Sequence, residues 1–207
     1  MLSEAFQATL KILLFRAGPA DFPYREDPGL SRGCIVLGIV ATAAVLGQML
    51  PLAMALASGV IATAALSMFV RTTLRLRGLE PRYVQTRNAL LATGSVLLLI
   101  MSLPMAAIMP GMMAFLESLR VAQDAIPAGG APLTISPDQM PDLPGGASLL
   151  LDLLTIWFFA VTSHVLRQAA NLGYFGAGVL ALLCVMNVVL LVAFAGPVLK
   201  LIFGGGA

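Results

Sequence analysis

The sequence predicts an all-α fold: a polytopic membrane bundle of five transmembrane helices, with an amphipathic interfacial helix at its N-terminal end. Two observations predict it. Of the 207 residues, 59% are hydrophobic and 11% are charged, whereas soluble domains carry about 25% charged residues. Such a chain has too few charges to cover a folded surface in water. Its apolar residues also form long charge-free runs, and about 20 residues suffice for a helix to cross the membrane.

The N-terminal segment, 1–32, is expected to lie in the cytoplasm and to begin with an amphipathic helix. At helical spacing, Glu4, Gln7 and Lys11 share one face. The opposite face carries apolar side chains, those of Leu2, Phe6, Leu10, Leu13 and Leu14. A helix with one polar and one apolar face is typical of a segment that lies in the plane of the membrane interface.

The first charge-free run, 33–70, decides the number of spans. As one helix it would reach about 57 Å, nearly twice the thickness of a hydrocarbon core of about 30 Å. Pro51 stands at its centre, and proline interrupts a helix because it lacks the backbone N–H. The run is either a single span, which gives four spans in all, or a hairpin with spans at 33–50 and 52–70 and a tight turn at 47–51, which gives five. A single first span would divide the basic residues almost evenly between the two sides, so we expect the hairpin.

Three further spans are expected at 88–110, 149–167 and 177–199, which completes a membrane domain over 33–207. Pro104 and Pro110 are expected to kink or end the third span. The residues that follow, to about 125, either extend that helix or lie along the membrane surface.

Between the third and fourth spans, residues 117–147 form a loop rich in proline and glycine. Five prolines between 127 and 144 exclude a regular helix through this part. The loop is expected on the external side. A partner-binding loop and a mobile tether both fit its length.

The basic residues are distributed unequally between the two sides of a five-span arrangement. Ten of the twelve fall on the side of the N-terminus, and only Arg120 and Lys200 fall on the other; the ten are Lys11, Arg16, Arg25, Arg32, Arg71, Arg75, Arg77, Arg82, Arg87 and Arg167. Lys and Arg accumulate in cytoplasmic loops. This predicts a cytoplasmic N-terminus and an external C-terminus. The preference for arginine over lysine hints at a GC-rich bacterial genome, and so at the bacterial inner membrane.

Five arginines stand between the second and third spans: Arg71, Arg75, Arg77, Arg82 and Arg87. The simpler interpretation is a topological anchor that holds this loop near anionic headgroups. The alternative is a contact site for a cytoplasmic partner or a specific lipid.

Small residues recur every four positions in the first two spans. They are Ala43, Gly47, Ala55, Gly59, Thr63 and Ser67. Such stripes let membrane helices approach closely. Packing within the monomer is the expected use, and a dimer seam is the alternative.

No reactive constellation emerges from the polar residues of the spans. Asp152 and His164 would lie about 18 Å apart along one helix, far beyond the reach of a hydrogen bond. Cys34 and Cys184 belong to no metal-ligand motif and are expected to act as small apolar fillers. Asn187 and Gln48 are uncharged and can hydrogen-bond between helices. We expect no catalytic residues, no metal and no cofactor.

Three stretches resemble the Yip1-domain family of membrane proteins: KILLFRAGPADFPYRED before the first hairpin, RYVQTRNALLATG leading into the third span, and LLTIWFFAVTSHVLRQA in the fourth. The resemblance implies five helices, a cytoplasmic N-terminus and an external C-terminus. Eukaryotic members act in vesicle traffic and bind small GTPases. Their acidic, aromatic N-terminal signature is missing here, and FPYRED at 22–27 is only a faint echo of it.

The function expected from these features is a non-catalytic membrane scaffold or accessory subunit. Its expected partners are membrane lipids and other membrane proteins or a second copy, and the net charge of +2 does not suggest nucleic acid. The alternative is a small transporter or channel, with a path lined by the kinked third span and Asn187.

Overall fold

The computed structural model describes residues 2–23, 28–124, 141 and 143–203. Within these residues the chain forms helices and no strand, which confirms the all-α prediction. Five helices among these residues are long and apolar enough to cross a membrane, as predicted, and they indicate an integral membrane protein. The elements are α1 Leu2–Leu13, η1 Pro19–Asp21, α2 Pro28–Leu46, α3 Leu52–Leu76, η2 Glu80–Arg82, α4 Tyr83–Asp124, α5 Gly145–Ala169 and α6 Tyr174–Phe203.

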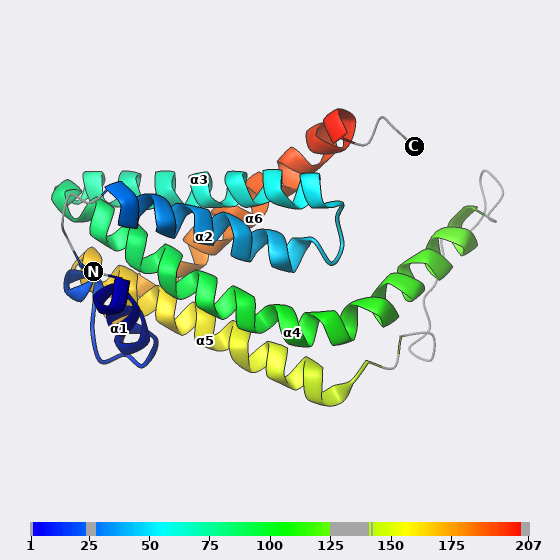
Figure 1. Cartoon of the computed structure of the whole chain (residues 1–207), viewed down its shortest axis with the longest axis horizontal. Coiled ribbons are helices and arrows are strands. Elements are labelled where there is room, and N and C mark those ends of the chain that lie inside the picture. Colours follow the sequence, from blue (N-terminus) through cyan, green and yellow to red (C-terminus); the bar gives the residue numbers. More distant parts are fainter. Residues whose placement is uncertain (1, 24–27, 125–140, 142, 204–207) are drawn as a thin grey trace.

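The long helices form a ring. Each packs mainly against two neighbours, in the cyclic order α2, α3, α6, α5, α4, and α3 also packs against α4. Consecutive helices run in opposite directions, so the N-terminal end of α2, the α3–α4 connection and the α5–α6 connection all lie at the same end of the molecule (Figure 1). We call this the basic end, because it carries most of the cationic side chains.

The α2–α3 hairpin turns at Pro51. Helix α2 ends at Leu46 and α3 begins at Leu52, with Pro51 in the capping position at a φ of −54°. Proline suits this position because its missing N–H would have no partner within the helix and its φ is already close to helical. The long apolar run thus becomes two helices.

Helix α4 differs from the expected third span, 88–110. It continues through Pro104 and Pro110 to Asp124, and at about 1.5 Å per residue it is about 63 Å long. Figure 1 shows it curving, with its C-terminal part turning away from the bundle. The prolines remove two backbone donors and bend the helix without ending it, which membrane helices tolerate when neighbouring groups satisfy the backbone.

The other helix bounds also extend beyond the charge-free runs. Helix α3 continues into the arginine segment and ends at Leu76. Of the expected loop at 117–147, residues 117–124 belong to α4 and residues 145–147 belong to α5. Residues 125–140 and 142 of that loop lie outside the described residues. Charge-free runs mark the hydrocarbon-embedded part of a helix. The helix itself can continue into the interface, where long side chains reach water.

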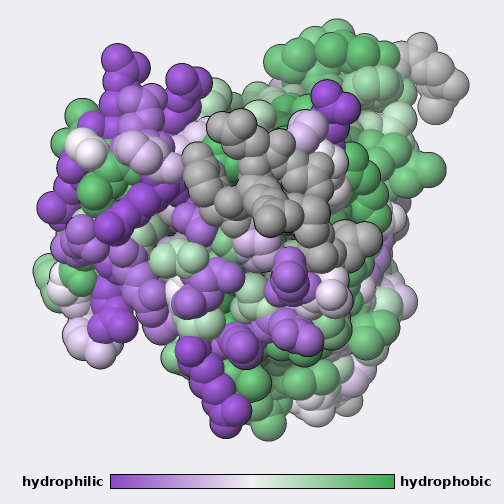
Figure 2. Space-filling model, turned by 60° about the vertical axis from the view of Figure 1, so that its left-hand side comes forward, coloured by the Kyte–Doolittle hydropathy of each residue, from purple (hydrophilic) through white to green (hydrophobic). Residues whose placement is uncertain are grey.

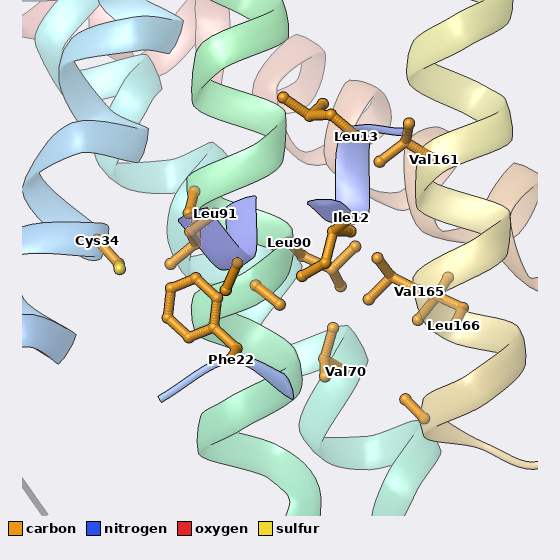
Figure 3. Packing of buried hydrophobic residues seen from close by; sticks show 14 of the residues in the cluster. Ile12, Leu13, Phe22, Cys34, Val70, Leu90, Leu91, Val161, Val165 and Leu166 are labelled. Atoms are coloured by element: carbon orange, nitrogen blue, oxygen red, sulfur yellow. The ribbon is translucent and has the colours of Figure 1, made fainter. Parts of the chain in front are cut away.

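A hydrophobic core fills the basic-end half of the ring, and the N-terminal segment contributes to it. Ile12 and Phe22 are fully buried beside Val70, Leu90 and Val165. Figure 3 shows these side chains converging from the N-terminal segment, α3, α4 and α5. Residues 2–23 are therefore packed into the bundle.

Helix α1 has three faces, where the sequence predicted two. Ala5, Ala8, Ile12 and Leu13 are buried against the bundle, so Leu13 leaves the apolar face to which it was assigned. Phe6, Leu10 and Leu14 remain exposed. The polar residues Glu4, Gln7 and Lys11 form the third face, also exposed.

Candidate functional site

The basic end gathers nine of the ten cationic residues that the charge distribution assigned to one side, and Arg25 lies outside the described residues. Arg120 and Lys200 lie near the opposite ends of α4 and α6. Figure 2 brings the basic end forward and shows hydrophilic side chains gathered over it, with hydrophobic side chains at the upper right. This end is the first candidate site.

Two of the five arginines in the segment 71–87 stabilise the bundle. The Arg82 guanidinium donates to the carbonyl of Ala169 at 3.4 Å and to Asn171 Oδ1 at 3.2 Å. It therefore satisfies the C-terminal end of α5, where backbone carbonyls lack partners and a cation is favoured. Arg87 donates to Ser31 Oγ of α2 and, at 3.1 Å, to Asn88 Oδ1. Both side chains join separate segments of the chain.

The other three arginines of this segment point into solvent. Arg71 approaches Glu80 at 4.0 Å, and both side chains are more than half exposed, so this ion pair contributes at most about 1 kcal/mol. The side chains of Arg75 and Arg77, at the C-terminal end of α3, are exposed and form no hydrogen bond or ion pair with any described residue. We call these two the free arginine pair.

Aromatic residues at the start of α6 lie beside the cationic side chains of the basic end. The Arg167 guanidinium lies 4.2 Å from the centroid of the Tyr174 ring, a cation–π contact. Tyr174 and Phe175 are 79% and 87% exposed. Aromatic side chains at this position suit the headgroup region of a membrane.

The N-terminal segment is fastened to α4 and α5 by hydrogen bonds to its backbone. Trp157 Nε1 donates to the Leu13 carbonyl at 3.1 Å. Gln85 Nε2 donates to the carbonyls of Ala20 and Phe22 at 3.0 and 2.8 Å. These donors satisfy backbone groups that no helix pairs, so they hold the segment in one position.

His164 belongs to the same attachment. Its Nε2 lies 3.0 Å from the Ala17 carbonyl, which can only accept, and 2.9 Å from the Gln168 amide nitrogen, which can only donate. The tautomer of the ring therefore selects which of the two partners this nitrogen bonds. A Cβ on Gly18 would stand 1.6 Å from Gln168 Oε1, so only glycine allows this approach. These contacts give His164 a positioning role, which the sequence analysis did not predict.

The small residues of the first two spans lie where α2 and α3 meet. A Cβ on Gly59 would stand 2.5 Å from the Ile39 carbonyl of α2. Ala43 and Ala55 are buried, and Gly47 lies in the turn beside Ala55. Thr63 and Ser67 continue the α3 stripe, and Ser67 Oγ donates to the Thr63 carbonyl at 2.7 Å. Gly59 therefore allows a close approach of α3 to α2.

A cavity of about 260 Å³ lies inside the ring and is the second candidate site. All five long helices line it, and no charged side chain does. Thr42 Oγ1 donates to the Gly38 carbonyl at 2.9 Å, and Ser95 donates to the Leu91 carbonyl, so these hydroxyls are used within their own helices. The cavity is apolar in character.

Asn187 does not line this cavity. Its Nδ2 donates to the Ala65 carbonyl of α3 at 3.4 Å, so it joins α6 to α3. Gln48 Nε2 donates to the Ser102 carbonyl at 2.9 Å and joins the hairpin turn to α4 near its first proline. Both amides make the contacts between helices that are typical of polar residues in membranes.

No family model, curated protein or solved structure matches the chain. Among the described residues, no group of three or more His, Cys, Asp and Glu side chains is placed to hold a metal ion. The two candidate sites differ in character: the basic end presents exposed guanidinium groups, and the cavity has apolar walls.

Proposed function

We propose that the protein is a non-catalytic membrane scaffold or accessory subunit that binds lipids or other membrane proteins through its basic end. The free arginine pair is the observation that supports this most directly. Arg82 and Arg87 are used inside the bundle, whereas Arg75 and Arg77 are exposed and meet no described acid. Exposed guanidinium groups are suited to carboxylates and phosphates, which they bind with two parallel hydrogen bonds.

A complex measured in native membranes tests this function. Mild cross-linking followed by native gel electrophoresis would compare the wild-type chain with the double variant Arg75→Gln, Arg77→Gln. We expect the wild type to migrate in a larger complex and the double variant to lose most of it. Arg120→Gln, at the opposite end of the bundle, is the matched control and should retain the complex. A wild-type chain that always migrates alone would contradict the proposal.

We propose that the chain lies in a bacterial inner membrane, with residues before α2 in the cytoplasm and the end of α6 outside. The positive-inside rule and the concentration of arginines at one end support this orientation. Helix α1 would lie in the cytoplasmic interface, with Phe6, Leu10 and Leu14 facing lipid. Membrane-impermeant labelling of cysteines introduced before α2 and after α6 tests it. Labelling of both from one compartment would refute the orientation.

Membership of the Yip1-domain family is part of the same proposal and rests on the sequence resemblance. The alternative function, a small transporter or channel, would need a path past Asn187. A solute flux into liposomes that changes on Asn187→Leu would support the transporter or channel. A flux that this substitution leaves unchanged would exclude a path past Asn187.

A further inference from the structure

We propose that the cavity inside the ring binds one acyl chain of a membrane phospholipid. This inference deepens the lipid binding proposed above, but it concerns a separate site, buried between the helices. It rests on the depth of the cavity, on where the ring is sealed and where it is open, and on the chemistry of its walls.

The cavity lies at hydrocarbon depth. On α4, the lining residues Leu90 and Leu98 stand about 10 and 22 Å from Tyr83 at the basic end, at about 1.5 Å per residue. On α6, Cys184 and Val189 stand about 15 and 22 Å from the first residue of that helix. Both helices start at the basic end and run in the same direction, and both place the cavity at the same level. In a core about 30 Å thick, this level is reached by acyl chains and not by headgroups.

The ring is sealed toward the basic end and opens farther from it. The buried residues of α5 all lie between Val161 and Ala169, and α6 has none between Cys184 and Leu199. Away from the basic end, Leu153 and Ile156 of α5 and Leu190 of α6 are all exposed. Figure 1 shows α6 running away from α5 in this direction. The two helices therefore separate beside the cavity and give it a lateral entrance from the lipid.

The walls favour hydrocarbon over water. They carry no charge, and a water molecule needs two to four polar partners. An apolar cavity of about 150 Å³ stays dry and admits benzene; this one, at about 260 Å³, has room for a longer hydrocarbon segment. Left empty, its lining would lose dispersion contacts. The surrounding bilayer supplies acyl chains at the entrance, and one chain entering between α5 and α6 restores those contacts.

Photo-cross-linking with a defined lipid tests the site. The full chain would be reconstituted into bilayers that contain phosphatidylglycerol with a diazirine in the middle of one acyl chain. After irradiation, the modified residues are identified by mass spectrometry. Cys184 lines the cavity and is 2% exposed, whereas its neighbour Leu182 is 53% exposed to the surrounding lipid. We expect modification of both residues in the wild type.

A pair of matched variants makes the test specific. A Cβ on Gly94, which lines the cavity, meets only Phe158 at 3.6 Å, whereas a Cβ on Gly178 meets nothing within 4 Å and lies outside the cavity. Gly94→Leu should lower modification of Cys184 at least tenfold and leave Leu182 unchanged. Gly178→Leu should change neither. A measurement of thermal unfolding would check that Gly94→Leu still folds. Because the leucine side chain fills a void, the Tm should be equal to or higher than that of the wild type.

The failure of this inference is distinguishable from the failure of the proposed function. Wild-type Cys184 that is never modified, or modification that survives Gly94→Leu, would overturn the acyl-chain site. Those results would leave the complex at the basic end untouched. Conversely, the variant with Arg75→Gln and Arg77→Gln should still be modified at Cys184, because neither arginine lines the cavity.

Discussion

Replacing Gly59 by alanine should separate α2 from α3. A Cβ at this position would stand 2.5 Å from the Ile39 carbonyl oxygen and 3.3 Å from the Ile39 Cα. Real Cβ atoms essentially never come closer than 3.0 Å to another heavy atom. The obstacle is backbone, which cannot rotate away as a side chain does. The two helices must therefore move apart by at least about half an ångström.

The expected loss of stability follows from this geometry. Adding a methyl group to a well-packed contact costs about 1–3 kcal/mol, and a clash with backbone places Gly59→Ala in the upper part of that range. For a chain of this size, about 2–3 kcal/mol corresponds to a fall in Tm of roughly 5–10 °C.

Gly33→Ala is the matched control. It makes the same substitution in α2, where a Cβ would meet nothing within 4 Å. Alanine restricts the unfolded chain and favours helix, so this variant should gain about 0.5–1 kcal/mol. Thermal unfolding of the purified chain in mild detergent measures both. The reasoning is refuted if the two variants shift Tm in the same direction, or if Gly59→Ala unfolds like the wild type.

Three further substitutions test the contacts at the basic end. Trp157→Phe keeps a ring but removes the donor to the Leu13 carbonyl. Losing this hydrogen bond costs about 0.5–1.5 kcal/mol, so the rate of proteolysis between α1 and α2 should rise about 2–10-fold. An unchanged rate would show that Trp157 does not hold the N-terminal segment in place. Gln85→Leu removes two hydrogen bonds to the N-terminal segment and should increase the same cleavage at least as much. Arg82→Gln should lower the Tm by a few degrees because the end of α5 loses its cationic donor. Arg75→Gln removes no side-chain hydrogen bond or ion pair and should leave the Tm unchanged. Equal Tm shifts for the two variants would contradict the structural role given to Arg82.

The elements most predictable from sequence were those governed by local apolar length. The five long helices follow from the charge-free runs and from Pro51, because crossing a hydrocarbon core requires a fixed length of apolar helix. For the third span, the sequence left open whether Pro104 and Pro110 bend the helix or end it, and the structure shows the helix continuing through both to Asp124. Whether a proline ends a membrane helix or bends it depends on which neighbours satisfy the backbone, and those neighbours are distant in sequence.

The candidate sites were less predictable. The five arginines look alike in sequence, yet the Arg82 side chain contacts residues 86 to 89 positions away. The Arg75 side chain forms no hydrogen bond or ion pair with any described residue. His164 and Trp157 gave no periodic signal, since each contacts a backbone carbonyl that only the docking of the N-terminal segment brings near. No pattern of residues in the sequence predicts the cavity, because its walls come from five helices and each helix contributes mostly apolar side chains.

The amino-acid sequence by itself determined that the chain forms five apolar helices and that its cations lie mostly on one side of them. Composition and the length of an apolar run are properties of one segment of the chain. The thickness of the hydrocarbon core sets the length of apolar helix that each segment needs, independently of the other segments. The tertiary structure alone decided the order of the helices in the ring, the burial of α1, which arginines stay free, and where α5 leaves α6. These features depend on how side chains from distant segments fit together, and only the folded chain brings those surfaces into contact.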